Sequence, residues 1–171
     1  MSAVLYLMRH GIAADPTRDT RDADRALTPD GVRKTRRVAM GLRVLGIQPS
    51  VILSSPLRRA EETAQIVAQL LSPTPTLELY PPLAAGAEPE AVLKNLRVGR
   101  GVQQVLLCGH EPDLGRLGSY LLTGTADLLQ MPFKKAGVAA FSVNAIPPRA
   151  PALLDWFLTP AQLRAVADSR K

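Results

Sequence analysis

The chain has 171 residues, of which 46% are hydrophobic and 21% charged, as in an ordinary globular domain with a core of its own. No apolar run approaches the roughly 18 residues that a membrane-spanning helix needs, and the single cysteine, Cys108, excludes an internal disulfide. We therefore expect one domain over residues 1–171, located in the cytoplasm and without a membrane partner, with Cys108 as a small buried hydrophobe.

The net charge of +6 and the isoelectric point near 10.0 raise the question of a nucleic-acid partner. The arginines are spread along the chain instead of forming a block, and an aromatic content of 4% leaves few rings to stack on bases. A basic balance also suits a protein that binds phosphate groups. We therefore expect no nucleic-acid partner.

The first predicted strand runs from about Val4 to Met8 and stops abruptly at Arg9-His10-Gly11, before a polar loop from Ile12 to Arg25. In one interpretation Arg9 only caps the strand and His10 is a histidine satisfied within a turn. In the other, an anion is held there, because a charged group at a sheet edge otherwise gains nothing over water. The sites of α/β proteins lie at such strand ends.

The first long helix is predicted to begin at Thr28-Pro29-Asp30, which supplies a cap, a proline at the first helical position and an acid near the positive end of the helix dipole. It should end at Gly46. Its buried face is expected to carry the apolar residues that recur at helical spacing, namely Val32, Val38 or Ala39, Leu42 and Leu45.

A second apolar run, from Val51 to Ser54, predicts a strand, and Ser55-Pro56 is expected to be the cap and first residue of the next helix. Arg58 and Arg59 then lie in the first helical turn, where free N–H groups and the helix dipole attract an anion. A cation at this position opposes the dipole. That cost is tolerable if a phosphate group lies between the arginines and the helix.

The rest of the chain continues the alternation of strands and helices. Strands are predicted from Thr76 to Leu79, Gln104 to Cys108, Val138 to Val143 and, at a sheet edge, Leu153 to Leu158. Helices are predicted from Glu88-Pro89-Glu90 to about Val98, from Pro112-Asp113 to near Gly124, and from Pro160 to about Ala167. This order predicts an α/β fold with a mostly parallel central sheet covered on both faces.

Parallel strands linked by right-handed crossovers place their carboxyl ends on one edge of a sheet. Arg9, His10, Arg59 and His110 should therefore meet there, and each of the two histidines of the chain ends a predicted strand beside a glycine. Guanidinium groups match phosphate oxygens, and a neutral imidazole among them is a nucleophile towards phosphorus. The sequence has no Cys/His cluster, paired-Asp motif or Walker loop, so we expect no metal and no cofactor.

Three stretches together resemble the histidine phosphatase (phosphoglycerate mutase-like) superfamily. They are Arg9-His10-Gly11 after a strand, Ser55 to Thr63 with its Arg59-Ala60 pair, and Gly109-His110 after a later strand. The short length, the segment from Asp24 to Gly31 and the sequence Gly-His-Glu-Pro at 109–112 resemble its small SixA-type phosphohistidine phosphatase branch. The match covers nearly the whole chain in order.

The resemblance implies a phosphoglycerate mutase-like three-layer α/β/α sandwich and a phosphatase that forms a covalent phosphohistidine intermediate. It makes His10 the nucleophile. Arg9 and Arg59 bind the phosphoryl oxygens, and His110 donates to the same group. Arg25 adds a further phosphate or substrate contact.

The proton donor is open at this point. Larger relatives use a Glu well after the first helix pair, to which Glu88 or Glu90 corresponds, or an Asp directly after the second histidine, where this chain has Glu111. Asp15 in the first loop is a further candidate, and helix capping is the alternative for Glu88 and Glu90. Glu111 is our first choice. A phosphohistidine substrate relaxes the need for an acid, because a leaving imidazole protonated from solvent departs readily.

Short connectors leave no insertion to roof the predicted site, which suits a phosphoryl group carried on a protein surface. The leading hypothesis is therefore a metal-independent phosphatase for phosphohistidine in a protein, in phosphorelay signalling. The alternatives are a small-molecule phosphomonoesterase or sugar phosphatase, and a non-catalytic anion-binding or nucleic-acid-binding protein. Arg58 is interpreted as a surface or substrate-side residue. Lys134 and Lys135 form either a solvated turn or a docking point for an acidic partner.

Overall fold

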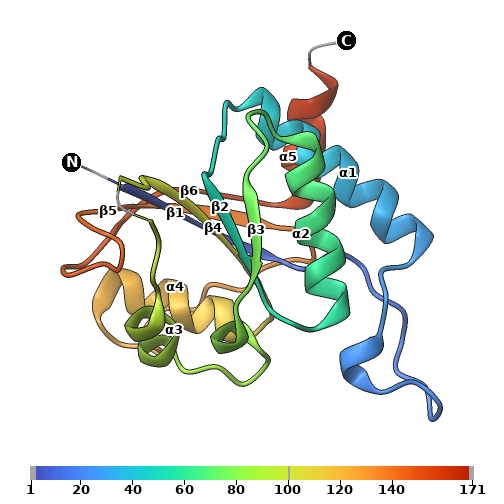
Figure 1. The fold of residues 1–171 in the computed structure, drawn as a ribbon, viewed down its shortest axis with the longest axis horizontal. Helices are drawn as coiled ribbons and strands as arrows, with labels where there is room; N and C mark the ends of the chain where they lie inside the picture. Colours follow the sequence, from blue (N-terminus) through green and yellow to red (C-terminus); the bar gives the residue numbers. More distant parts are fainter. Residues whose placement is uncertain (1–2, 100, 170–171) are drawn as a thin grey trace.

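Residues 3–99 and 101–169, which the computed structural model describes, form one mixed sheet of six strands with helices on both faces (Figure 1). The strand order is β3-β2-β4-β1-β5-β6. The bounds of the strands are β1 Ala3–Arg9, β2 Val51–Ser54, β3 Thr76–Leu79, β4 Gln104–Gly109, β5 Val138–Val143 and β6 Leu153–Leu158. These strands lie within one or two residues of their predicted bounds, and the α/β fold class is confirmed.

The sheet is parallel on one side of β1 and antiparallel on the other. Strands β3, β2, β4 and β1 pair in parallel, whereas β5 pairs antiparallel with β1, and β6 antiparallel with β5 at the predicted edge. Three of the five strand pairs among the described residues are parallel, as the prediction of a mostly parallel sheet requires. Because those strands run the same way, β1, β2 and β4 end at the same edge of the sheet.

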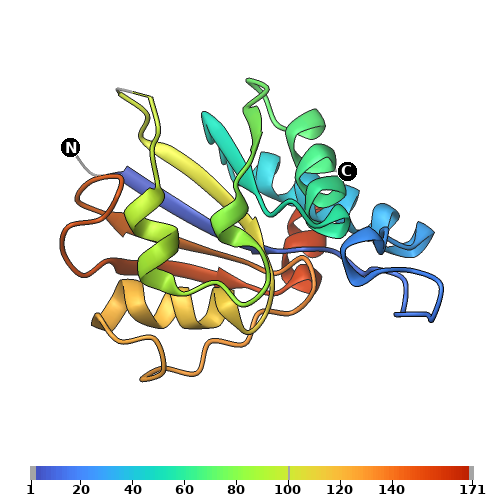
Figure 2. The ribbon, with the colours of Figure 1, turned by 60° about the horizontal axis from the view of Figure 1, so that its bottom comes forward.

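The helices form two layers, one on each face of the sheet (Figure 2). One layer contains α1 (Pro29–Val44), α2 (Arg58–Leu70) and α5 (Pro160–Asp168), and the other contains α3 (Pro89–Asn95) and α4 (Asp113–Thr123). Two short 3-10 turns, η1 (Asp22–Asp24) and η2 (Pro81–Leu83), lie in the connections. Together these layers confirm the expected α/β/α sandwich. None of the helices within the described ranges is long and apolar enough to cross a bilayer.

Strand alternation divides the core between the two layers. Leu5 and Leu7 of β1 pack in the cluster that includes α3 and α4, while Tyr6 and Met8 pack in the cluster that includes α1, α2 and α5. Cys108 of β4 belongs to the second cluster and is buried. Burial raises the pKa of its thiol to about 12, which confirms its interpretation as a buried hydrophobe.

Helix starts follow the sequence at α1 and depart from it at α2. The Thr28 side chain accepts a hydrogen bond from the Gly31 N–H at 2.9 Å, as its predicted capping role requires. The prediction that Ser55 caps the next helix is wrong, because α2 begins only at Arg58 and Leu57 is its cap residue. The Ser55 hydroxyl instead bonds to the ring of His110 at 2.7 Å.

The α3 helix also ends earlier than predicted, at Asn95 instead of about Val98. Leu96 leaves helical geometry, with φ −65° and ψ 107°. Its side chain is fully buried in the core cluster under α3 and α4. Burial of this one leucine therefore takes precedence over extension of the helix.

Strand register brings the two histidines together. In the parallel pair of β1 and β4, Arg9 lies opposite Gly109, so His10 and His110 emerge side by side where the strands end. The backbone continues this pairing, because the His10 N–H donates to the Gly109 carbonyl at 3.0 Å. The neighbouring pair aligns Ser54 of β2 with Cys108, which places Ser55 beside them.

Candidate active site

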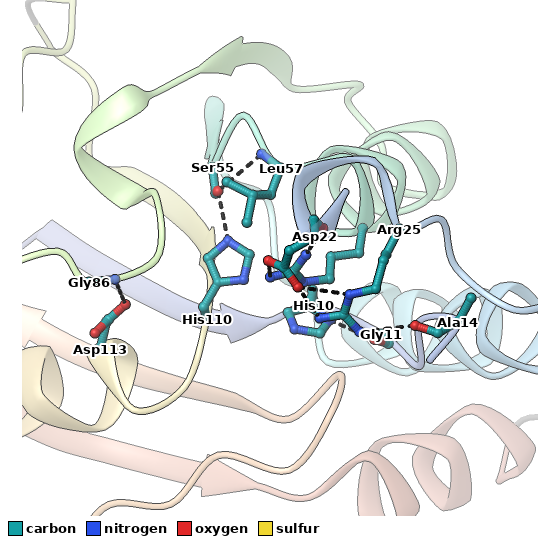
Figure 3. Close-up of polar contacts among 11 residues, drawn as sticks. His10, Gly11, Ala14, Asp22, Arg25, Ser55, Leu57, Gly86, His110 and Asp113 are labelled. Atoms are coloured by element: carbon teal, nitrogen blue, oxygen red, sulfur yellow. Dashed lines mark hydrogen bonds and ion pairs between the residues drawn. The ribbon is translucent and has the colours of Figure 1, made fainter. Parts of the chain in front are cut away.

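His10 and His110 lie close together at the carboxyl edge of the sheet (Figure 3). Their ring centroids are 5.2 Å apart, and the two residues are only 7% and 3% exposed. Both rings face a volume shared with polar side chains of the first loop and of the loop after β2. The structure thus brings together the two histidines that the sequence separates by a hundred positions.

The hydrogen bond made by His10 fixes which ring nitrogen carries the proton. His10 Nδ1 lies 2.7 Å from the Gly11 carbonyl oxygen, which can only accept. Nδ1 therefore carries the proton of the neutral ring, and the lone pair resides on Nε2. This is the tautomer that a nucleophilic histidine needs.

Burial keeps both imidazoles neutral. Desolvation lowers the pKa of His10 to about 3, and the positive charges of Arg59 and Arg9 act in the same direction. For His110, burial together with the charge of Arg59 lowers the pKa to about 4. Both rings are therefore unprotonated at neutral pH.

The hydrogen bonds of Ser55 determine which ring nitrogen of His110 carries the proton. The Ser55 oxygen accepts from the Leu57 N–H at 3.3 Å and lies 2.7 Å from His110 Nε2. Because the serine oxygen already accepts from Leu57, its hydroxyl proton is free to donate to His110 Nε2. The proton of the neutral His110 ring then lies on Nδ1. Nδ1 is buried and has no hydrogen-bond partner among the described residues. His110 thus presents a free N–H donor, as its predicted role requires.

Arg9 and Arg59 each bind protein groups through their terminal nitrogens and leave Nε without a partner among the described residues. Arg9 Nη1 donates to the Phe133 carbonyl at 2.7 Å. Arg59, 4% exposed at the start of α2, donates to the Asp22 carbonyl at 2.7 Å and to its carboxylate at 3.1 Å. The Nε atoms of both arginines are buried and find no acceptor in the described part of the chain.

Asp22 is a site residue that the sequence reasoning missed. Its carboxylate lies between Arg59 and Arg25, whose Nη2 is 2.7 Å away (Figure 3). The hydrogen bond from Arg25, together with the charge of Arg59, lowers the pKa of Asp22, so the group stays ionised. Asp22 and Arg59 are separated by 37 positions, and no local pattern marks their contact.

Asp22 and Arg25 fold the first loop back onto α2. Arg25 also donates to the Ala14 carbonyl at 2.9 Å, and an isolated bridge between Ala13 and Leu27 closes the neck of this loop. Arg25 therefore reaches the edge of the site, where the sequence expected a further substrate contact. Its present partners are Asp22 and the loop backbone.

Gly11 and Thr63 hold the end of β1, next to His10, against α2. The Gly11 N–H donates to the Thr63 hydroxyl at 2.9 Å, and this hydroxyl donates to the Arg59 carbonyl at 2.6 Å. A Cβ at position 11 would lie 2.4 Å from the Thr35 hydroxyl. Only glycine allows this close approach, which explains the glycine that follows His10.

Among the four candidate acids, Glu111 is half-buried and within reach of the charge of Arg9. Burial raises its pKa, while hydrogen bonding to the Phe133 N–H and the charge of Arg9 oppose that shift. One carboxylate oxygen accepts from Phe133 at 3.2 Å, and the other is buried with no partner among the residues described. Glu88 is instead paired with Arg116, and Glu90 and Asp15 are exposed.

Other residues singled out from the sequence lie around the site. Arg58 is exposed and pairs with Glu62 at 2.7 Å, as a surface residue would. Lys134 and Lys135 are exposed on the turn that precedes β5. Within residues 3–99 and 101–169, no three His, Cys, Asp or Glu side chains are grouped as a metal site would require.

The lowered pKa values predict that neither histidine titrates in the physiological range. Because the chain has two histidines, NMR spectra of the untagged protein should show two sets of ring signals. Between about pH 8 and pH 5 we expect less than about a tenth of either ring to become protonated. A midpoint near the ordinary value of about 6.5 for either ring would contradict the described burial.

Comparisons with known proteins agree with this arrangement. Residues 5–81 match the family model described as histidine phosphatase superfamily (branch 1). An uncharacterised protein of a Picosynechococcus strain is 38% identical over 145 residues, which span 82% of this chain and 86% of that protein. Phosphohistidine phosphatase SixA of Escherichia coli is 26% identical over 162 residues, covering 94% and 96%.

A solved structure shows the same likeness in three dimensions. The protein histidine phosphatase SixA complexed with tungstate has a TM-score of 0.76 and 25% identity, and the match covers 94% of this chain and 99% of that one. The sequence and the fold thus both support phosphatase activity. The chain belongs to the histidine phosphatase superfamily.

Proposed function

We propose that this protein is a metal-independent phosphatase that removes phosphate from phosphohistidine in a protein, through a covalent intermediate on His10. One observation carries the proposal. Two neutral imidazoles with ring centroids 5.2 Å apart share a buried edge with Arg9 and Arg59, and three N–H donors there lack partners within the described residues. A phosphoryl group supplies the oxygens that these donors need.

In the first step, His10 Nε2 attacks phosphorus as the bond from phosphorus to the leaving group breaks. The Arg9 and Arg59 guanidiniums and the His110 Nδ1–H donate to the phosphoryl oxygens, and Arg25 adds positive charge at the loop side. These donors are already in place, so they stabilise the developing charge without reorganisation. A leaving imidazole takes up a proton as it departs.

In the second step, water attacks the phosphorus of phosphorylated His10. The bond from phosphorus to Nε2 breaks, inorganic phosphate leaves, and the neutral imidazole is restored. Because its pKa is about 3, His10 accepts no proton from water at neutral pH and is ready for another cycle. The hydrogen bond from Nδ1 to Gly11 holds the ring in the same tautomer throughout.

The choice of substrate rests on chemistry and not on the fold, since one fold serves many substrates. A phosphohistidine has a good leaving group and makes little demand on a protein acid, in keeping with a site whose carboxylates are either ion-paired or bonded to backbone. Similarity to SixA supports the same choice. We place the reaction in phosphorelay signalling in the cytoplasm, where a free thiol such as Cys108 persists.

Glu111 is the proposed proton donor for leaving groups that need one. Burial raises its pKa, which is the direction that a proton donor needs, whereas the lowered pKa of Asp22 keeps that carboxylate charged. A protonated Glu111 can release its proton to a departing alkoxide.

Trapping of the intermediate tests the central step. Wild-type protein incubated with a ³²P-labelled phosphohistidine peptide in the presence of EDTA, then quenched in alkali, should carry acid-labile label. His10→Ala should carry none and should lose at least about a thousandfold in kcat/KM, because no other group replaces a covalent nucleophile. Label on His10→Ala, or a wild type that turns over only without EDTA, would refute the proposal.

Replacement of the acid should separate substrates by their leaving groups. Glu111→Gln is expected to lower kcat for a sugar phosphate by about 10²-fold or more, the usual contribution of general acid catalysis. The effect on a phosphohistidine peptide should be within about threefold, because solvent protonates its imidazole. Equal losses for both substrates would remove Glu111 as the acid. A wild type that prefers sugar phosphates or p-nitrophenyl phosphate to phosphohistidine would assign the enzyme to small esters.

A further inference from the structure

A cationic hollow of about 410 Å³ adjoins the proposed phosphate site on the side of β1 that faces α1 and α5. The two share Arg9, which lies at the end of β1. The other basic side chains that line the hollow come from three further segments, with Lys34 on α1, Lys134 and Lys135 on the turn before β5, and Arg164 on α5. The proposed reaction uses none of these four.

Most of this charge is not neutralised inside the molecule. Lys34 pairs with Asp30 at 2.7 Å. The side chains of Lys134, Lys135 and Arg164 have no acidic partner within the described chain, although every one of them lines the same hollow. Like charges around one hollow repel one another, so an anion bound in the hollow would be stabilised by all three.

The turn that carries the lysines is attached directly to the nucleophile. The Ala136 N–H donates to the carbonyls of Arg9 and His10, both at 3.1 Å. The Gly137 N–H closes the turn on the Lys134 carbonyl at 2.7 Å. Ala136 has φ 63°, in the left-handed region that L residues rarely adopt. The turn around it places Lys134 and Lys135 in the lining of the hollow, together with Arg9.

The wall of the hollow also includes one neutral polar residue. Thr35 on α1 is fully buried, and its hydroxyl has no hydrogen-bond partner among the residues that the structure describes. This hydroxyl is therefore closed to a ligand in the hollow, and the cations alone are the set that carboxylate oxygens would meet there. None of the described residues that line the hollow is aromatic, so nucleotide bases would find no ring to stack on.

We propose that this hollow binds an acidic segment, rich in Asp and Glu, that lies next to the phosphohistidine in the protein substrate. The inference rests on the proposed function, because it names a feature of the substrate that the same site would dephosphorylate. Carboxylates held by Lys134, Lys135 and Arg164 would orient the phosphoryl group towards Arg9 and His10. The hollow thereby selects among phosphoproteins by the charge around their phosphohistidine.

Two phosphohistidine peptides of equal length test this selection, one with four Glu beside the phosphohistidine and one with four Gln. For the wild type at low salt, we expect kcat/KM for the Glu peptide to exceed that for the Gln peptide by about tenfold, mainly through KM. The preference should shrink as NaCl is added, because the lysines are exposed. The ratio of the two peptides within one protein cancels any loss of folded enzyme.

The variants then locate the preference. Lys134→Glu/Lys135→Glu/Arg164→Glu should abolish or reverse the ratio, and the conservative Lys134→Arg/Lys135→Arg/Arg164→Lys should retain it. Arg43→Glu is the matched control, because Arg43 is exposed in the last turn of α1, away from the hollow, and should leave the ratio within about twofold of wild type.

Several outcomes would overturn the inference. A wild-type ratio of kcat/KM for the two peptides near one would show that the hollow does not select substrates. The same conclusion would follow if the triple reversal variant kept the wild-type ratio. A single-stranded oligonucleotide that binds more tightly than the Glu peptide, and loses that binding in the same variant, would assign the hollow to nucleic acid. If the wild type dephosphorylates neither peptide, the proposed function fails. Fluorescence anisotropy with the unphosphorylated Glu peptide then tests separately whether the hollow binds an acidic segment, because the wild type should bind this peptide and the triple reversal variant should not.

Discussion

Buried nitrogen donors on Arg9, Arg59 and His110 that lack partners among the described residues are the constraint on which the rest of the site depends. A buried donor without an acceptor costs roughly 1–3 kcal/mol, and more when it is charged. Three such costs are comparable with the net stability of a whole domain, which is about 5–15 kcal/mol. A fold that accepts them at one place, beside two neutral imidazoles, has donors in position for an oxyanion.

The register of β1 against β4 is what makes this arrangement possible. Arg9 opposite Gly109 sets His10 beside His110, and a slip of one residue would turn one imidazole to the other face of the sheet. Packing on both faces prevents such a slip, since Leu5 and Leu7 belong to one core cluster and Tyr6 and Met8 to the other. The stability of the core and the geometry of the site therefore have the same origin.

The sequence predicts much of this because buried strands appear as apolar runs and parallel crossovers determine where those runs end. For that reason Arg9, His10 and His110 meet at one edge of the sheet, and Arg59 follows in the first turn of the helix after β2. Tertiary partners decide the rest. The sequence around Ser55 predicts a helix cap, but in the fold its hydroxyl forms a hydrogen bond with His110. The contact of Asp22 with Arg59 joins a loop to a helix, and no periodic pattern in the sequence predicts it. Glu111 is a candidate proton donor in the sequence because it directly follows His110, but only the fold shows that its carboxyl group is partly buried.

A crystal structure with tungstate, a tetrahedral oxyanion like phosphate, tests the central claim most directly. We expect the metal of the anion to lie in line with His10 Nε2, with its oxygens accepting from Arg9, Arg59 and His110 Nδ1 at about 2.7–3.2 Å. Tungstate bound elsewhere on the surface, with these donors turned to protein groups instead, would contradict the account.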